Sequence, residues 1–267
     1  MALFKNILGE GTDIVLLHGW GMHSGIWQSL PQQLAQQMTQ QHRITTIDLP
    51  GHGNSSATIK TDTLEKLAET IAPHLPTQAI IIGWSLGGMA AMQLALMLPE
   101  KISRLILITS SARFTQTNNL NINQTGHWPH AMAPEVLQQF SQMLQQDPQA
   151  TLRRFLSLQL RGCDNERELL RQLLQLLNQS DMPNNDALRD TLNILAKSDL
   201  RHQIKNINCP VRLIYGQHDR IVPSSVGDTM TNCLPNAKQH TIAGAGHAPF
   251  LSHPEKFLEL LNKYLYD

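Results

Sequence analysis

The chain has 267 residues, with 21 basic and 21 acidic side chains. A chain of this length can bury a full core, and such chains commonly form one α/β domain with an inserted subdomain. The balanced charge, without a long block of one sign, argues against nucleic acid as a ligand. The three cysteines, Cys163, Cys209 and Cys233, are odd in number and form no CxxC pair, which argues against a disulfide framework and a zinc site.

The N-terminal stretch and one uncharged segment indicate the cellular location of the protein and whether it contacts a membrane. Residues 1–11 contain no apolar run of signal-peptide length and no small-residue cleavage site, so we expect a cytoplasmic protein. The uncharged segment 79–98 is long enough to cross a bilayer, but glycines interrupt it in the middle. We expect it to form a strand and then a buried helix, and we predict no membrane contact.

Apolar strand runs alternate with helical stretches along the first part of the chain. Strands are predicted at 14–17, 44–47, 80–82 and 105–108, and helices at 26–38, 63–74 and 86–98. This alternation is typical of a mostly parallel central sheet flanked by helices, and it predicts an α/β fold.

The pattern changes between residues 113 and 205, where Leu, Gln and Arg recur at helical spacing. We predict an inserted helical cap over 113–205, between the two parts of the core, 1–112 and 206–267. Strand signals return at 211–215 and 239–242. A closing helix follows, for which Ser252 and Glu255 are predicted to form a capping box with Pro254 near N1.

A Gly-x-Ser-x-Gly pattern, Gly83-Trp84-Ser85-Leu86-Gly87, lies between a predicted strand and a predicted helix. Such a turn exposes the serine hydroxyl at the carboxyl edge of the sheet, and its glycines permit the tight bend. The N-terminus of the following helix favours negative charge, as an oxyanion requires. We predict that Ser85 is a nucleophile and that the backbone N–H of Leu86 is one oxyanion donor.

The second oxyanion donor is expected in the turn after the first predicted strand, Leu16-Leu17-His18-Gly19-Trp20-Gly21. We nominate the backbone N–H of Trp20. The side chain of His18 is expected to shape this turn rather than to take part in the reaction.

In this type of sheet the acid and the base follow the serine, in that order, each after a later strand. Asp219 follows the strand at 211–215, and His247 follows the strand at 239–242. We predict that His247 is the base and that Asp219 orients it. Asp48 precedes the serine and is expected to cap a loop, and His218 lies before the acid. Neither a His-Glu-x-x-His motif nor a cysteine pair exists, so no metal is predicted.

Taken together, the motifs resemble those of a known family, the pimeloyl-[acyl-carrier-protein] methyl ester esterases of biotin synthesis, within the α/β-hydrolases. The resemblance runs nearly end to end, and its motifs are Leu16-Leu17-His18-Gly19-Trp20-Gly21, Asp48-Leu49-Pro50-Gly51, Gly83-Trp84-Ser85-Leu86-Gly87-Gly88, Ala248-Pro249-Phe250 and Ser252-His253-Pro254. The tryptophan before the serine is the narrower signal, because the first two motifs recur across many α/β-hydrolases.

This resemblance implies an α/β-hydrolase fold, catalysis by Ser85, Asp219 and His247 through an acyl-enzyme, release of methanol, and no cofactor. It also implies substrate contacts, at Trp20, Ser85, Leu86, His247 and the cap residues Phe140, Ser141, Gln142, Met143 and Leu144. Trp84 and Phe155 are further candidates for lining an apolar slot, although large apolar residues of this kind are as often simply core.

If the acyl chain is carried on an acyl carrier protein, the cap should present basic groups to an acidic partner. Arg153, Arg154 and Arg161 are the candidates. A solvated helix side is the other reading, because nearby acids such as Asp147 nearly balance the charge.

Other functions remain open for the same machinery. A broad short-chain carboxylesterase and a hydrolase that cleaves C–C bonds would use the same residues, and a noncatalytic α/β-hydrolase that binds small molecules is a different class. We expect the protein to be a monomer.

Overall fold

The computed structural model describes residues 3–36, 41–56, 60–117, 128, 130–180 and 182–266. Among them, one sheet has the strand order β1-β3-β2-β4-β5-β6-β7. The strands are β1 (Lys5–Leu8), β2 (Thr12–Leu17), β3 (His42–Ile47), β4 (Ala79–Trp84), β5 (Ile102–Ile108), β6 (Val211–Gly216) and β7 (Ala237–Ile242). Only β1 is antiparallel, to β3, and the other described pairs are parallel. The prediction of a mostly parallel α/β sheet is confirmed.

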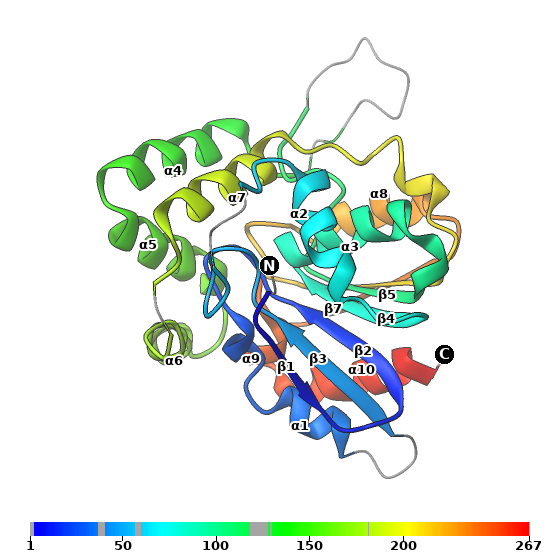
Figure 1. Ribbon diagram of the computed structural model, residues 1–267. Coiled ribbons are helices and arrows are strands. Elements are labelled where there is room, and N and C mark those ends of the chain that lie inside the picture. The colour runs from blue at the N-terminus through cyan, green and yellow to red at the C-terminus, as the bar shows by residue number, and fades with distance from the viewer. Residues whose placement is uncertain are drawn as a thin grey trace.

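Helices cover both faces of this sheet (Figure 1). One face carries α1 (Leu30–Ala35), α9 (Pro249–Ser252) and α10 (Pro254–Tyr266), and the other carries α2 (Leu64–Ile71), α3 (Leu86–Met97) and α8 (Ser225–Cys233). Short 3-10 segments lie at Ser24–Trp27, Ala72–His74, Pro99–Lys101 and Ile204–Asn206. The two layers of helices bury the central strands on both sides, which explains their continuous apolar runs.

The uncharged segment 79–98 forms β4 and α3, as predicted. Every residue of β4 is buried, and so is α3 from Leu86 to Ala95, because this helix is apolar all round and lies against β4, β5 and α2. In the described part of the chain, no helix combines the length and the apolar character needed to cross a membrane.

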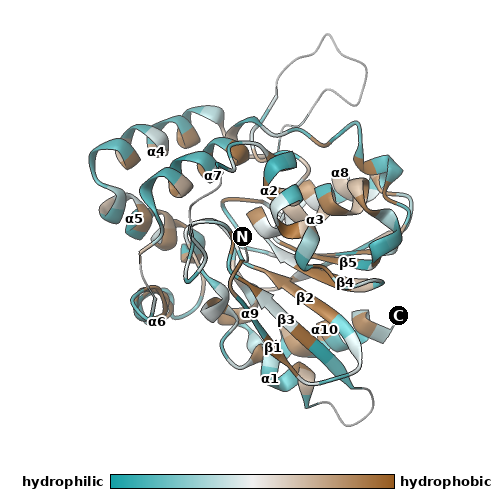
Figure 2. Cartoon of the chain, viewed as in Figure 1, coloured by the Kyte–Doolittle hydropathy of each residue, from teal (hydrophilic) through white to brown (hydrophobic). Residues whose placement is uncertain are grey.

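In the described part of the chain, four α-helices lie between β5 and β6: α4 (Pro134–Gln146), α5 (Pro148–Leu160), α6 (Glu166–Leu177) and α7 (Asn185–Lys197). We call them the inserted helices, and Figure 1 shows that they gather to one side of the sheet. They mix hydrophobic and hydrophilic positions, whereas hydrophobic residues concentrate in the strands (Figure 2). In α4, for example, the helical spacing predicts one apolar face of Leu137, Phe140, Met143 and Leu144; three of these side chains are buried, and Met143 is half-buried.

The structure corrects several predicted elements. The helix predicted at 26–38 is divided into the 3-10 segment Ser24–Trp27 and α1, because Gln28 has a positive φ of 48° between them; position 38 lies outside the described residues. The predicted capping box at Ser252 is wrong: Ser252 ends α9, and its hydroxyl donates to the carbonyl oxygen of Ala248 at 3.4 Å. The closing helix α10 does begin at Pro254.

Several elements were not predicted, among them β1 and α8. β1 is a four-residue edge strand whose side chains are mostly exposed, so it lacks the apolar alternation that marks a half-buried strand. α8 joins β6 to β7, and its polar, β-branched sequence is not typical of a helix. Parallel strands need such a crossover, and the topology therefore supplies a helix that the local pattern does not.

Candidate active site

Ser85 lies in the turn between β4 and α3, with φ 55° and ψ −116°. Non-glycine residues rarely adopt such a φ, and the surroundings hold it here: the Ser85 N–H donates to the carbonyl oxygen of Ile108 at 3.0 Å. A Cβ on Gly87 would lie 2.2 Å from the carbonyl oxygen of Leu17, and one on Gly83 would lie 2.5 Å from that of Gly87. Any larger residue at Gly83 or Gly87 would therefore clash with the main chain.

The three side chains predicted as nucleophile, base and acid form one chain of hydrogen bonds. His247 Nε2 lies 3.0 Å from Ser85 Oγ, and His247 Nδ1 lies 2.8 Å from Asp219 Oδ2. The other carboxylate oxygen of Asp219 accepts the backbone N–H groups of Ile221 and Val222 at 2.8 and 3.0 Å. Because a carboxylate only accepts, Nδ1 of His247 carries the proton and Nε2 is free to accept from Ser85. These contacts are consistent with a Ser–His–Asp catalytic triad.

The main chain of His247 is fixed on two sides. Its carbonyl oxygen accepts from Trp84 Nε1 at 2.8 Å and from the hydroxyl of Thr109 at 2.7 Å. Its N–H donates to the carbonyl oxygen of Gln159, in α5, at 3.0 Å. We call the turn Gly83-Trp84-Ser85-Leu86-Gly87 the elbow. Its tryptophan thus holds the loop of His247 as well as flanking the serine.

The turn after β2 approaches the serine closely. A Cβ on Gly19 would lie 3.2 Å from Ser85 Cβ, so the main chain of Gly19 and Trp20 passes beside the elbow. His18 fastens this turn: Nδ1 bonds to the carbonyl oxygen of Gly19, and Nε2 accepts the N–H of Leu49, both at 2.9 Å. Burial, helped by the charge of nearby His52, lowers the pKa of His18 to about 3, so its imidazole stays neutral.

Asp48 serves the neighbouring loop. Its carboxylate is buried and accepts the backbone N–H groups of Ser24 and Asn54 at 2.6 and 2.9 Å. This is the loop-capping role expected from the sequence. His52, in the same loop, is fully buried, and burial lowers its pKa to about 4.

Two of the inserted helices lie against the turn after β2. Trp20 Nε1 donates to the carbonyl oxygen of Leu188, in α7, at 2.9 Å. The Trp20 ring packs edge-on against the ring of Phe155, in α5, with 4.8 Å between the ring centroids. The ring of Phe140, in α4, packs edge-on against Phe155, with 5.4 Å between the centroids. Phe155 therefore contacts the turn directly, and Phe140 lies one layer behind it.

The residues that follow Phe140 in α4 point in different directions. Met143 lines a groove of about 410 Å³ between α4 and α5 together with Phe140, whereas Ser141 lines a second groove beside α7. Gln142 is exposed and Leu144 is buried. The five residues 140–144 do not converge on one cavity.

The groove between α4 and α5 also contains Arg154 and Arg161, with Glu166 at its edge. Arg153 is exposed but is not among the residues that line this groove. Two of the three candidate arginines, Arg154 and Arg161, therefore face one space, and the carboxylate of Glu166 partly offsets their charge.

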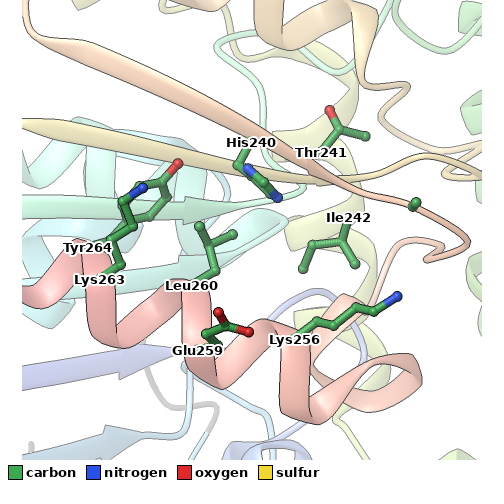
Figure 3. Close-up of a pocket in the computed structure, with 9 residues that line it drawn as sticks. His240, Thr241, Ile242, Lys256, Glu259, Leu260, Lys263 and Tyr264 are labelled. Carbon is green, nitrogen blue, oxygen red and sulfur yellow. The ribbon is translucent and has the colours of Figure 1, made fainter.

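Another groove, of about 480 Å³, lies between β7 and α10 (Figure 3). His240 of β7 faces it, opposite Lys256, Glu259 and Lys263 of α10. Its described lining includes neither the residues of the hydrogen-bonded chain nor the turn after β2.

Among the residues that the structure describes, no group of three or more His, Cys, Asp or Glu side chains is placed to hold a metal ion. All three cysteines are free thiols, and burial raises the pKa of Cys163 to about 11. A thiol with so high a pKa is a poor nucleophile.

Sequence reasoning missed some residues that support these contacts. The Ser110 hydroxyl donates to the carbonyl oxygen of Ser85 at 2.8 Å, and the Tyr215 hydroxyl donates to that of Ser110 at 2.9 Å. His218, set aside because it precedes the acid, bonds through Nδ1 to the carbonyl oxygen of Gly162 at 2.7 Å. No local pattern marks them, because each acts across a long separation in sequence.

The doubly wound sheet, the elbow and the Ser–His–Asp contacts define a hydrolase of the α/β class with a serine nucleophile. A family model described as alpha/beta hydrolase fold matches residues 13–254. The chain is 38% identical over 257 residues to the pimeloyl-[acyl-carrier protein] methyl ester esterase of Photobacterium profundum, covering 96% of each chain. It is 37% identical over 266 residues to that of Aeromonas hydrophila, covering 99% and 100%. The chain therefore belongs to the α/β-hydrolase family and, within it, to the family of the pimeloyl-[acyl-carrier protein] methyl ester esterases.

Solved structures agree on the fold. An esterase from Exiguobacterium antarcticum matches with a TM-score of 0.86 at 21% identity, covering 99% of this chain and 96% of that one. The enol-lactonase from Burkholderia xenovorans matches with a TM-score of 0.80 at 20% identity, with the same coverage. At such identities the likeness shows the fold alone, since the same fold supports many reactions.

Proposed function

We propose that this protein is a serine carboxylesterase that hydrolyses the methyl ester of a pimeloyl group carried on acyl carrier protein. The hydrogen-bonded chain from Ser85 through His247 to Asp219 carries the proposal. The relatives at 38% identity, whose names give this ester, support the choice of substrate.

The reaction follows from the geometry in two halves. His247 Nε2 takes the proton of Ser85, the alkoxide attacks the ester carbonyl, and the protonated imidazole then gives that proton to the departing methanol. Water, deprotonated by His247, next attacks the acyl-enzyme; the bond from the acyl carbon to Ser85 Oγ breaks, His247 returns the proton to Oγ, and the acid leaves as its carboxylate. Asp219 stabilises the imidazolium in both halves, and the side chains of this chain supply every proton transfer, so no cofactor is required.

The developing oxyanion would be held by the backbone N–H groups of Trp20 and Leu86. Leu86 is the first residue of α3, where N–H groups lack partners within the helix, and the turn that contains Trp20 passes beside Ser85. We place the acyl chain against Trp20 and Phe155, with Phe140 behind them. Of the contacts implied for residues 140–144, those of Ser141 and Gln142 receive the least support from the packing.

We further infer that residues 113–205 act as a cap over a core of residues 1–112 and 206–267. The cap would receive the carrier protein at Arg154 and Arg161, whose groove could also take an extended substituent, while Arg153 stands outside it. One chain would act alone, as a monomer, because it supplies the whole proposed triad and both oxyanion donors. A carrier-linked substrate and unpaired thiols favour the cytoplasm.

Methanol release from pimeloyl-carrier methyl ester tests the proposal. The wild-type chain should release methanol from it much faster than from unrelated methyl esters, and Ser85→Ala should abolish the release. Ser103→Ala, which removes a hydroxyl from β5 outside the site, is the matched control and should change nothing. Equal rates on all esters would favour a broad carboxylesterase, and failure of Ser85 to react with a fluorophosphonate would favour a noncatalytic binding protein.

A further inference from the structure

The end of helix α5 touches the loop that carries the proposed base. The carbonyl oxygen of Gln159 accepts the N–H of His247 at 3.0 Å. A Cβ on Gly246 would lie 2.5 Å from the sulfur of Cys163 and 2.8 Å from the carbonyl oxygen of Gln159. The turn at 159–163 therefore presses against the histidine loop without space for a side chain between them.

His218 joins this turn to the loop of the acid. Its Nδ1 lies 2.7 Å from the carbonyl oxygen of Gly162, and because a carbonyl only accepts, Nδ1 carries the proton. The backbone N–H of His218 donates to the carbonyl oxygen of Ala245 at 2.8 Å. Its neighbour in the chain is Asp219. One residue thus links the acid loop, the histidine loop and the inserted helices.

These contacts complete the support of His247. On the sheet side, Trp84 and Thr109 hold the main-chain carbonyl oxygen of His247, and α5 holds its main-chain N–H. Catalytic groups must be held within a fraction of an ångström of their productive geometry, and small displacements reduce rates strongly. The position of α5 therefore enters directly into the position of the imidazole.

We propose that His218 is a positioning residue for this reaction. By holding Gly162, it keeps the end of α5 against residues 246–247 and so keeps the imidazole of His247 between Ser85 and Asp219. This role rests on Ser85 and His247 acting as proposed above. It is separate from the chemistry, because His218 touches none of the reacting atoms.

The test compares three substitutions of His218 on a small nitrophenyl ester. His218→Ala and His218→Phe both remove the donor, and the second keeps the bulk of a ring. Each should lower kcat and the rate of fluorophosphonate labelling about 3- to 10-fold, the loss of one hydrogen bond, with KM within twofold of wild type. His218→Asn, whose amide N–H can replace Nδ1–H, should recover wild-type kcat within twofold. His240→Ala, an exposed histidine on β7, is the matched control and should leave kcat unchanged.

A spectroscopic readout separates positioning from general stability. The downfield proton resonance of the His247–Asp219 hydrogen bond should broaden in His218→Ala and return in His218→Asn. Since the side chain of His218 is exposed, the unfolding midpoint of the His218→Ala protein should equal that of the wild type. Wild-type kcat in His218→Ala and His218→Phe, or a loss of kcat that His218→Asn shares, would overturn the proposal. Failure of the wild-type chain to turn over or label would instead refute the proposed function.

Discussion

The loops at the end of the sheet and the inserted helices touch at Trp20 and at His247 but are held together differently. The elbow is held by main-chain hydrogen bonds and by glycines with no free space, as at Gly83 and Gly87. The inserted helices are held by apolar side chains, and their polar faces are exposed. The sheet loops can therefore fix reacting atoms, while the inserted helices can change their outer residues without disturbing them.

After loss of the nucleophile itself, the largest effect should come from replacing the acid in the sheet loops. Asp219→Asn replaces the acceptor of the His247 Nδ1–H and favours the wrong tautomer, so kcat should fall about 10⁴-fold with the fold intact. Steady-state kinetics on a nitrophenyl ester measures it. Asp228→Asn, at an exposed position of α8, is the control. A loss below tenfold in Asp219→Asn would contradict the role given to this carboxylate.

This difference in packing predicts that a Gly→Ala substitution lowers the free energy of unfolding by different amounts in the two regions. Gly87→Ala places a Cβ 2.2 Å from a backbone oxygen and should lower the free energy of unfolding by about 3 kcal/mol or more. Gly162 lies in the turn after α5, and a Cβ there would meet no atom closer than 3.7 Å, so the only strain comes from its φ of 87°. Gly162→Ala should therefore lower the free energy of unfolding by about 1–2 kcal/mol. Urea unfolding of both variants gives the comparison, and equal losses would remove the proposed distinction.

The buried imidazoles of the sheet loops predict a pH dependence of stability. Burial lowers the pKa of His18 to about 3 and of His52 to about 4, from 6.5. Below about pH 6.5 the unfolded chain takes up protons that the folded chain does not, so stability is complete above that pH and falls toward pH 4. Each group contributes about 1.4 kcal/mol per pH unit in this window. In urea unfolding at several pH values, His52→Asn should show a slope smaller by that amount, and an unchanged slope would refute the contribution.

The smallest effect on stability is expected from substitutions on the exposed side of the inserted helices. Arg154→Glu with Arg161→Glu should change stability by less than about 0.5 kcal/mol and leave turnover of a small nitrophenyl ester unaffected. Turnover of the carrier-linked ester should fall about tenfold, through weaker association with an acidic partner. Arg167→Glu with Arg171→Glu, the same charge change on α6, is the control. Equal loss on both substrates would exclude a carrier contact here.

Local patterns were sufficient for the elements that the site needs most. Apolar runs indicated β4 and β5, and the glycines around Ser85 indicated the elbow, because both depend on neighbours in sequence. Chain order and placement after later strands selected Asp219 and His247, and the structure brings both to the serine. The edge strand β1 and the crossover helix α8 escaped prediction because exposure and topology, rather than local periodicity, define them.

The amino-acid sequence by itself determined the parallel sheet, the strained serine turn and the order of its partners, because short-range sterics and hydrophobic periodicity specify all three. Only the tertiary structure decided which inserted residues reach the site. Phe155 rather than Phe140 meets Trp20, and the carbonyl oxygens of Gln159 and Gly162 bond to His247 and His218. Such contacts join main-chain atoms and ring edges far apart in sequence, where side-chain identity carries no periodic signal, so packing alone sets them.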